Sequence, residues 1–270
     1  MTELTIRRVV VACDVSCDVR LTMNAAVELA QRLGAAVHGI FLEDGGLRRL
    51  TELPFGRQVS LSAADIAEPL MSGLELANML DALGTAARQA LAAAADKRRL
   101  DWSFALAQDV IEPLEPGDLL VIEASARAFS GAWRPRSRWE ARTQELGDVV
   151  LFRRGGTEGS GIVLVLSGDE TLDQRLLSAV LTLGDPAEEI VIAPLEGVSG
   201  AQEATTRALD RLKSLGRRAR LGALSLQDAE WLQGPGAPHP RLVAIANRGD
   251  QPELARAVFA KTGADVLLLR

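Results

Sequence analysis

Apolar residues follow two patterns along the chain: short uninterrupted runs, and stripes that repeat every three to four residues. Runs with the length and β-branched content of buried parallel strands occur at 7–14, 35–44, 102–108, 118–124 and 147–154. Two stripes predict helices. The first starts at an Asp18 or Ser16 cap and ends at Gly34, and the second runs from 74 to 100. This alternation is typical of a parallel α/β sheet.

The same pattern starts again after GGTEGSG (155–161), which has the composition of a linker. GIVLVLSGDE matches RRVVVACDVS in position, and DVLLLR closes the chain as GDVVLFRR closes the first half. We infer an internal duplication with one doubly wound parallel sheet in residues 1–155 and a shorter one in residues 156–270. The segment 44–73 lacks clean periodicity and is long for a connection, so it is either a surface loop or a lid.

Composition places the chain among soluble globular proteins, with 47% apolar residues, 24% charged residues and a net charge of −6. Neither half is basic as a whole, which argues against nucleic acid as a partner. No run reaches the roughly 18 apolar residues of a membrane span, and the N-terminus lacks the apolar core of a signal peptide. The chain has only two cysteines, Cys13 and Cys17, so a cytoplasmic location is expected.

The stretch VVVACDVSCDVRLTMNAAVELAQRLGAAVHGIFLED (9–44) resembles the opening of the universal stress protein family. In that family a strand ends at an aspartate, a helix closed by glycine follows, and a second strand comes next. With the duplication, the chain is similar to a tandem universal stress protein. The resemblance implies two adenine-nucleotide-hydrolase-like α/β domains that pair through their closing strands as an internal pseudo-dimer. It also implies a nucleotide site beside Asp14, a position that Ser167 occupies in the second half.

Members of this family that hold ATP carry G-x2-G-x9-G-[S/T] after the fourth strand, because glycine lets backbone N–H groups approach phosphate. In the first half this spacing falls on Glu123, Ala126, Arg136 and Ser137, so the final hydroxyl is kept and the glycines are absent. A carboxylate at Glu123 would repel phosphate. In the second half the loop itself is deleted. We expect the second nucleotide site to be lost and the first to be degenerate.

Arginine and tryptophan crowd the segment that follows the fourth strand of the first half, residues 121–142. One interpretation is a site for ATP or another anion, in which Arg127 and Arg136 replace the missing backbone donors beside Asp14 and Ser137. Another is a solvated loop whose arginines pair with nearby glutamates.

The third interpretation of this segment is a surface for a protein partner, because tryptophan and arginine are favoured interface anchors. The candidate anchors are Trp133, Arg134, Arg138 and Trp139. Further self-association of the chain is compatible with the same surface.

Catalytic and metal-binding patterns are absent from the sequence. His38 and His239 are not accompanied by the other residues of a catalytic arrangement. Cys13 and Cys17 are expected to be buried and to pack as small apolar side chains, with a redox role as the alternative. The sequence therefore predicts a non-catalytic binding or regulatory protein of the stress response, with no metal and no required cofactor. The alternatives are atypical binding of ATP in the first domain, with slow hydrolysis, and a structural subunit of a larger assembly.

Overall fold

The computed structural model describes residues 5–15, 17–43, 57–59, 67–69, 73–108, 114–123, 149–153, 159–194, 200–222, 240–246, 258, 262 and 264–269. In the first half (residues 1–155) the described elements are β1 (Arg8–Cys13), α1 (Val19–Leu33), β2 (Ala36–Glu43), β3 (Arg57–Val59), β4 (Ala67–Pro69), α3 (Gly73–Arg98), β5 (Trp102–Gln108), β6 (Asp118–Glu123) and β7 (Val149–Arg153). In the second half (residues 156–270) they are β8 (Ile162–Leu166), α6 (Glu170–Leu183), β9 (Ile190–Pro194), α7 (Ala201–Ser214), β10 (Ala219–Leu221), β11 (Leu242–Ala246) and β12 (Asp265–Leu269).

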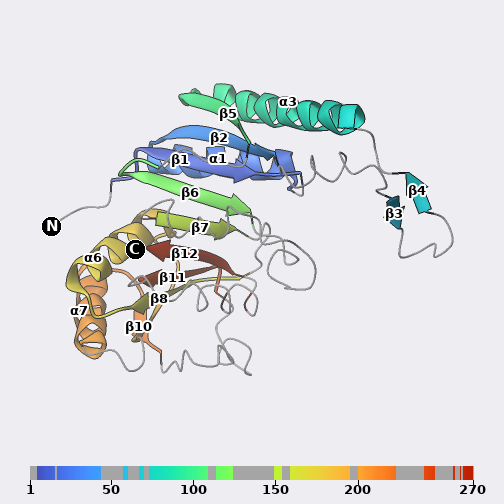
Figure 1. The fold of residues 1–270 in the computed structure, drawn as a ribbon. Helices are drawn as coiled ribbons and strands as arrows, with labels where there is room; N and C mark the ends of the chain where they lie inside the picture. The colour runs from blue at the N-terminus through green and yellow to red at the C-terminus, as the bar shows by residue number, and fades with distance from the viewer. Residues whose placement is uncertain are drawn as a thin grey trace.

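Ten of these strands form one sheet in the order β10-β9-β8-β11-β12-β7-β6-β1-β2-β5 (Figure 1). From its outer strand to the centre of the sheet, each half has the same order: the third main strand, the second, the first, the fourth and the fifth. Strands within a half pair in parallel, while β7 and β12 pair antiparallel, with Leu151 opposite Leu267. The two closing strands therefore cover each other's edges.

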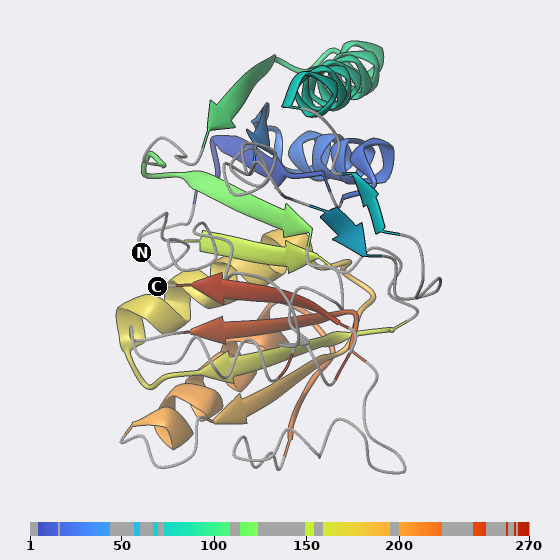
Figure 2. The ribbon, with the colours of Figure 1, turned by 45° about the vertical axis from the view of Figure 1, so that its right-hand side comes forward.

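The apolar runs form strands because both faces of the sheet are buried. Every residue of β8, β11 and β12 is buried, and β1 is buried after its first residue. Alternate residues of these strands belong to two apolar clusters, one on each face. The larger cluster takes in residues from all four described helices, and the helices accordingly lie on the same side of the sheet (Figure 2).

Helix ends follow the signals in the sequence. The Asp18 carboxylate accepts a hydrogen bond from the backbone N–H of Leu21 and caps α1, and Gly34 ends the helix in the left-handed conformation. Asp169 caps α6 in the same way through the N–H groups of Thr171 and Leu172. These caps set the directions in which both helices leave the sheet.

The connection between β2 and α3 contains a short hairpin that the apolar pattern did not predict. Within it β3 pairs antiparallel with β4, with Gln58 opposite Glu68, and the pair forms a sheet of its own. Most of the segment proposed as a lid lies outside the described residues. In the described part of the chain, no helix is long and apolar enough to cross a membrane.

Candidate functional site at the ends of β1 and β8

Ligands of open parallel sheets bind beyond the carboxyl ends of the strands, so the strand-to-helix turns after β1 and β8 are the places to examine. The last residues of the two strands, Cys13 and Leu166, belong to the same apolar cluster on the helix-covered face. The next residues, Asp14 and Ser167, therefore occupy equivalent positions, as the sequence comparison of the two halves predicts.

In the first half this turn is long and partly exposed. Three residues separate Asp14 from the cap Asp18. The Cys17 backbone N–H donates to the Asp14 carbonyl oxygen at 3.2 Å, and the Cys17 thiol lies 3.6 Å from Oδ1 of Asp14. Thr22, the fourth residue after the cap, is buried and donates its hydroxyl to the backbone oxygen of Asp18 at 2.8 Å. The described part of this turn thus places one acid and one thiol beside the end of β1.

In the second half the turn is short and filled by a carboxylate. A single residue, Gly168, separates Ser167 from the cap Asp169. Asp173, the fourth residue after that cap, points its carboxylate back into the turn. Its Oδ1 accepts from the backbone N–H and the hydroxyl of Ser167 at 2.8 and 3.1 Å, and its Oδ2 accepts from the Gly168 N–H at 2.9 Å.

Such a pair of backbone N–H groups at the start of a helix is a general anion site. Here the anion is a side chain of the same chain. Asp173 is 7% exposed and Ser167 is fully buried. Burial raises the pKa of the Asp173 carboxyl, and the hydrogen bonds from Ser167 and Gly168 oppose that rise. An external phosphate would meet occupied donors and a negative charge at this turn.

Sequence reasoning identified Ser167 but missed Asp173. A signal was present: Asp173 lies on the stripe of α6 that buries Leu172, Leu176 and Leu177. An acid on the apolar face of a helix requires hydrogen-bond partners in the core. The nearest donors along the chain are in the turn before the helix.

Of the predicted anion-site residues, Asp14 is the one that the structure describes, at the end of β1. Glu43, at the end of β2, is buried. The other predicted anion-site residues and the predicted partner surface lie outside the described residues: Arg127, Arg136, Ser137, Trp133, Arg134, Arg138 and Trp139. Their roles stay predictions.

The remaining chemically reactive residues of the described regions have ordinary surroundings. His38 Nδ1 lies 2.7 Å from the Ser103 hydroxyl oxygen on the neighbouring strand β5. The Cys13 thiol is buried and lies 3.6 Å from the backbone oxygen of Ile40. Among the described residues, no group of three or more histidine, cysteine, aspartate or glutamate side chains could hold a metal ion.

Two solved structures with a similar architecture are of universal stress proteins. One from Archaeoglobus fulgidus DSM 4304 matches with a TM-score of 0.58 and 11% identity, over 97% of this chain and 96% of that chain. A protein from Pseudomonas aeruginosa UCBPP-PA14, assigned to the universal stress proteins, matches with a TM-score of 0.53 and 14% identity, over 98% and 94%. No family model matches the sequence, and no curated protein matches it. The chain therefore has the α/β fold of the universal stress proteins.

Proposed function

We propose that this chain is a tandem universal stress protein-like binding or regulatory protein without catalytic activity, in which the second nucleotide site is closed. The observation that carries the proposal is the Asp173 carboxylate in the turn after β8. Where a nucleotide-binding domain would offer backbone N–H groups to a phosphate, this half has a permanent internal anion.

Two features support a tandem arrangement with domains at 1–155 and 156–270. The strand order repeats, and the closing strands β7 and β12 pair antiparallel with Val266 opposite Phe152 and Leu269 opposite Val149. In this arrangement the second domain takes the place of a second subunit. Such a pseudo-dimer leaves neither closing edge open to another copy.

Among the described residues of the first half, the position equivalent to Asp173 carries no carboxylate. The equivalent position is Thr22, and its hydroxyl bonds to the helix backbone rather than to the turn. Atypical binding of ATP or another anion, through Asp14, Arg127, Arg136 and Ser137, is therefore the second candidate function. A partner surface around Trp133 and Trp139 belongs to the first candidate, because it needs no ligand.

The test is a calorimetric titration of the purified chain with ATP, after denaturation of a sample to identify any nucleotide that co-purified. Wild type, Asp14→Asn and Asp173→Ser are compared. The proposal expects no released nucleotide and no saturable heat from wild type at millimolar ATP. Saturable binding that Asp14→Asn abolishes and Asp173→Ser leaves intact would assign a working site to the first half. Saturable binding that persists in Asp14→Asn would show that the binding site does not depend on Asp14. Either result would overturn the expectation that the chain binds no nucleotide.

A further inference from the structure

A small pocket of about 110 Å³ lies where the two halves meet. We call it the junction pocket. The first half contributes one face of α1 and the end of β7, and the second half contributes the end of α6 and the starts of β11 and β12. Its lining residues are Ala25, Glu28, Leu29, Arg32, Leu151, Arg153, Leu183, Arg241, Leu242 and Asp265.

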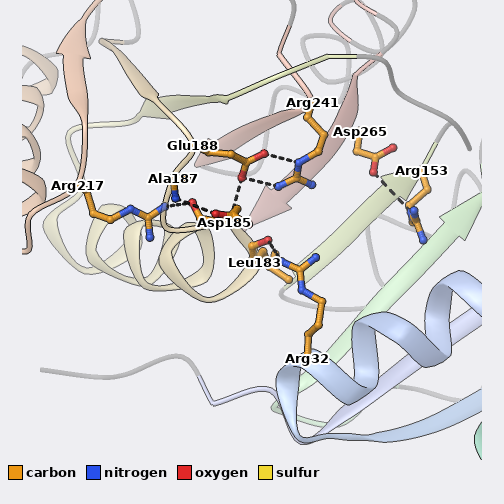
Figure 3. A network of polar contacts seen from close by, with 9 residues as sticks. All are labelled: Arg32, Arg153, Leu183, Asp185, Ala187, Glu188, Arg217, Arg241 and Asp265. Atoms are coloured by element: carbon orange, nitrogen blue, oxygen red, sulfur yellow. Dashed lines mark hydrogen bonds and ion pairs between the residues drawn. The ribbon is translucent and has the colours of Figure 1, made fainter. Parts of the chain in front are cut away.

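Three guanidinium groups belong to this lining, and each comes from a different element. Arg32 reaches from α1 toward the end of α6, where Nη2 donates to the backbone oxygen of Leu183 at 2.9 Å (Figure 3). Arg241 lies just before β11, and Arg153 is the last residue of β7. The concentration of three arginines around one small pocket is what an anion site requires.

The carboxylates nearby pair with arginines and balance much of their positive charge. Glu28 is 63% exposed and pairs with Arg98, whose Nη2 lies 2.9 Å from Oε1. Glu188 forms a bidentate pair with Arg241, with distances of 2.6 and 2.9 Å. Asp265 contacts Arg153 at 3.5 Å, longer than a charge-assisted hydrogen bond of good geometry. An anion in the pocket would compete with Asp265 for Arg153, and with Glu188 for Arg241 and Arg32.

The guanidinium groups have unused donor capacity. Each has five N–H groups. In the described part of the chain, Arg32 makes a single hydrogen bond, through Nη2, and Arg241 makes its pair with Glu188 through Nε and Nη2. The Nε and Nη1 groups of Arg32 and the Nη1 group of Arg241 are therefore left to bind a ligand with several oxygens.

From this geometry we infer that the junction pocket binds a phosphate group, either as free phosphate or as the terminal group of a small phosphomonoester. Phosphate offers several oxygens to guanidinium forks from different directions, which suits three arginines better than a single carboxylate would. The volume is sufficient for one such group and too small for a nucleotide. The pocket is thus too small to be one of the nucleotide sites considered above.

Because both halves line the pocket, a bound phosphate would link them. Arg32 comes from the first half and Arg241 from the second, so a ligand that contacts both stabilises their packing by mass action. Phosphate should therefore raise the melting temperature of the whole chain. Sodium chloride at the same ionic strength should raise it less, because it lacks the oxygens that the forks recognise.

The experiment is calorimetric titration of the full chain with inorganic phosphate, glycerol phosphate and citrate at constant ionic strength. Two variants are compared with wild type. Arg32→Gln removes one guanidinium from the pocket. Arg217→Gln is the matched control, because Arg217 also donates Nη2 to a backbone oxygen near the end of α6, that of Asp185 at 2.7 Å, but does not line the pocket.

We expect saturable binding of phosphate to wild type, a loss of about tenfold or more in affinity for Arg32→Gln, and no change for Arg217→Gln. Binding of both phosphate ligands would identify a phosphomonoester site, and binding of inorganic phosphate alone would identify a site for the free anion. Three results would each overturn the inference: no saturable binding of either phosphate ligand, binding of citrate alone, or equal losses in both variants. The melting temperature of each variant without ligand shows whether it is folded.

Discussion

The two strand-to-helix turns occupy the same place in the two halves, yet they are built in opposite ways. The turn after β1 has three residues before its cap, and a hydroxyl, Thr22, at the fourth position of the helix. The turn after β8 has one residue, Gly168, before its cap, and a carboxylate, Asp173, at that fourth position. A shorter turn brings the helix closer to the strand end, and a carboxylate on the helix then reaches the N–H groups of the turn.

The difference shows how one architecture can carry two turns whose hydrogen-bond donors are satisfied differently. Strand order is alike in both halves, and an aspartate caps the first helix of each. What differs is the group that accepts hydrogen bonds from the donors of the turn. Replacing an external anion by an internal one keeps those donors satisfied when no ligand is bound. In the second half the donors of the turn are therefore satisfied by the carboxylate of Asp173.

The largest expected effect comes from Asp173→Ala. Removal of the carboxylate leaves the Ser167 N–H, the Ser167 hydroxyl and the Gly168 N–H without their acceptor in a buried turn. We expect a loss of about 3 kcal/mol in the free energy of unfolding, measured by urea denaturation. Thr22→Ala, the matched change in the first half, should cost about 1 kcal/mol or less. Equal losses would show that Asp173 has no special role in its turn.

The pH dependence of the same variant gives a second readout. Burial raises the pKa of the Asp173 carboxyl above its ordinary value of 3.8. The folded chain therefore takes up a proton at this carboxyl at a higher pH than the unfolded chain does. Wild type gains stability from this group as the pH falls through its folded pKa. The stability difference between wild type and Asp173→Ala should widen on acidification, and a difference that narrows toward pH 3.8 would contradict the assignment.

The architecture could be predicted from the sequence because it depends on patterns along the chain. Uninterrupted apolar runs specify strands buried on both faces, and the cap Asp18 marks the start of α1. Asp173 could not be recognised from such patterns, since its partners are donors that become available only when the turn folds beside the helix. The same holds for the junction pocket, whose three arginines come from α1, β7 and the residue before β11. The hairpin β3–β4 was missed because each of its strands has only three residues.

A second comparison concerns the glycines that end α1 and α6. Gly34 has a φ of +62°, and a Cβ there would meet no atom within 4 Å. Gly184 has an ordinary extended conformation, but a Cβ there would lie 2.6 Å from Cδ1 of Ile162 and 2.8 Å from the backbone oxygen of Val180. Gly34 is thus required because its backbone is in the left-handed conformation. Gly184 is required because no space is left for a Cβ atom.

The corresponding alanine variants should differ in the size of their effect. Gly184→Ala should cost about 2 kcal/mol in the free energy of unfolding, because the backbone oxygen of Val180 cannot move without disturbing α6. Gly34→Ala should cost about 1 kcal/mol, and Gly34→Asn should recover part of that loss, because asparagine tolerates the left-handed conformation. Denaturation of the three variants measures both differences. A larger loss for Gly34→Ala than for Gly184→Ala would reverse the interpretation.

A third comparison concerns ion pairs at the amino ends of the strands. In the first half the acid is on the fourth main strand, where Asp118 of β6 pairs with Arg8 of β1 at 2.5 and 2.9 Å. In the second half a base occupies the equivalent position. This base is Arg241, just before β11, and it pairs with Glu188. The start of the fourth main strand thus carries the acid in the first half and the base in the second, and each half has a bidentate ion pair.

Glu188→Gln should have a small effect at neutral pH and the clearest pH dependence. The hydrogen bonds from Arg241 lower the pKa of the Glu188 carboxyl below its ordinary value of 4.5, against the opposing effect of burial. The pair therefore contributes its full stability above pH 4.5 and loses it as the pH falls through the folded pKa. At pH 7 the variant should be about 1 kcal/mol less stable than wild type. That difference should disappear on acidification, the reverse of the behaviour expected for Asp173→Ala.

Glu189→Gln is the control: its pair with Arg220 at 3.3 Å is half exposed on both sides and should change stability little at any pH. If Glu188→Gln shows a loss that is independent of pH, the charge of Glu188 is not what stabilises this corner, and packing around Arg241 would have to account for the loss.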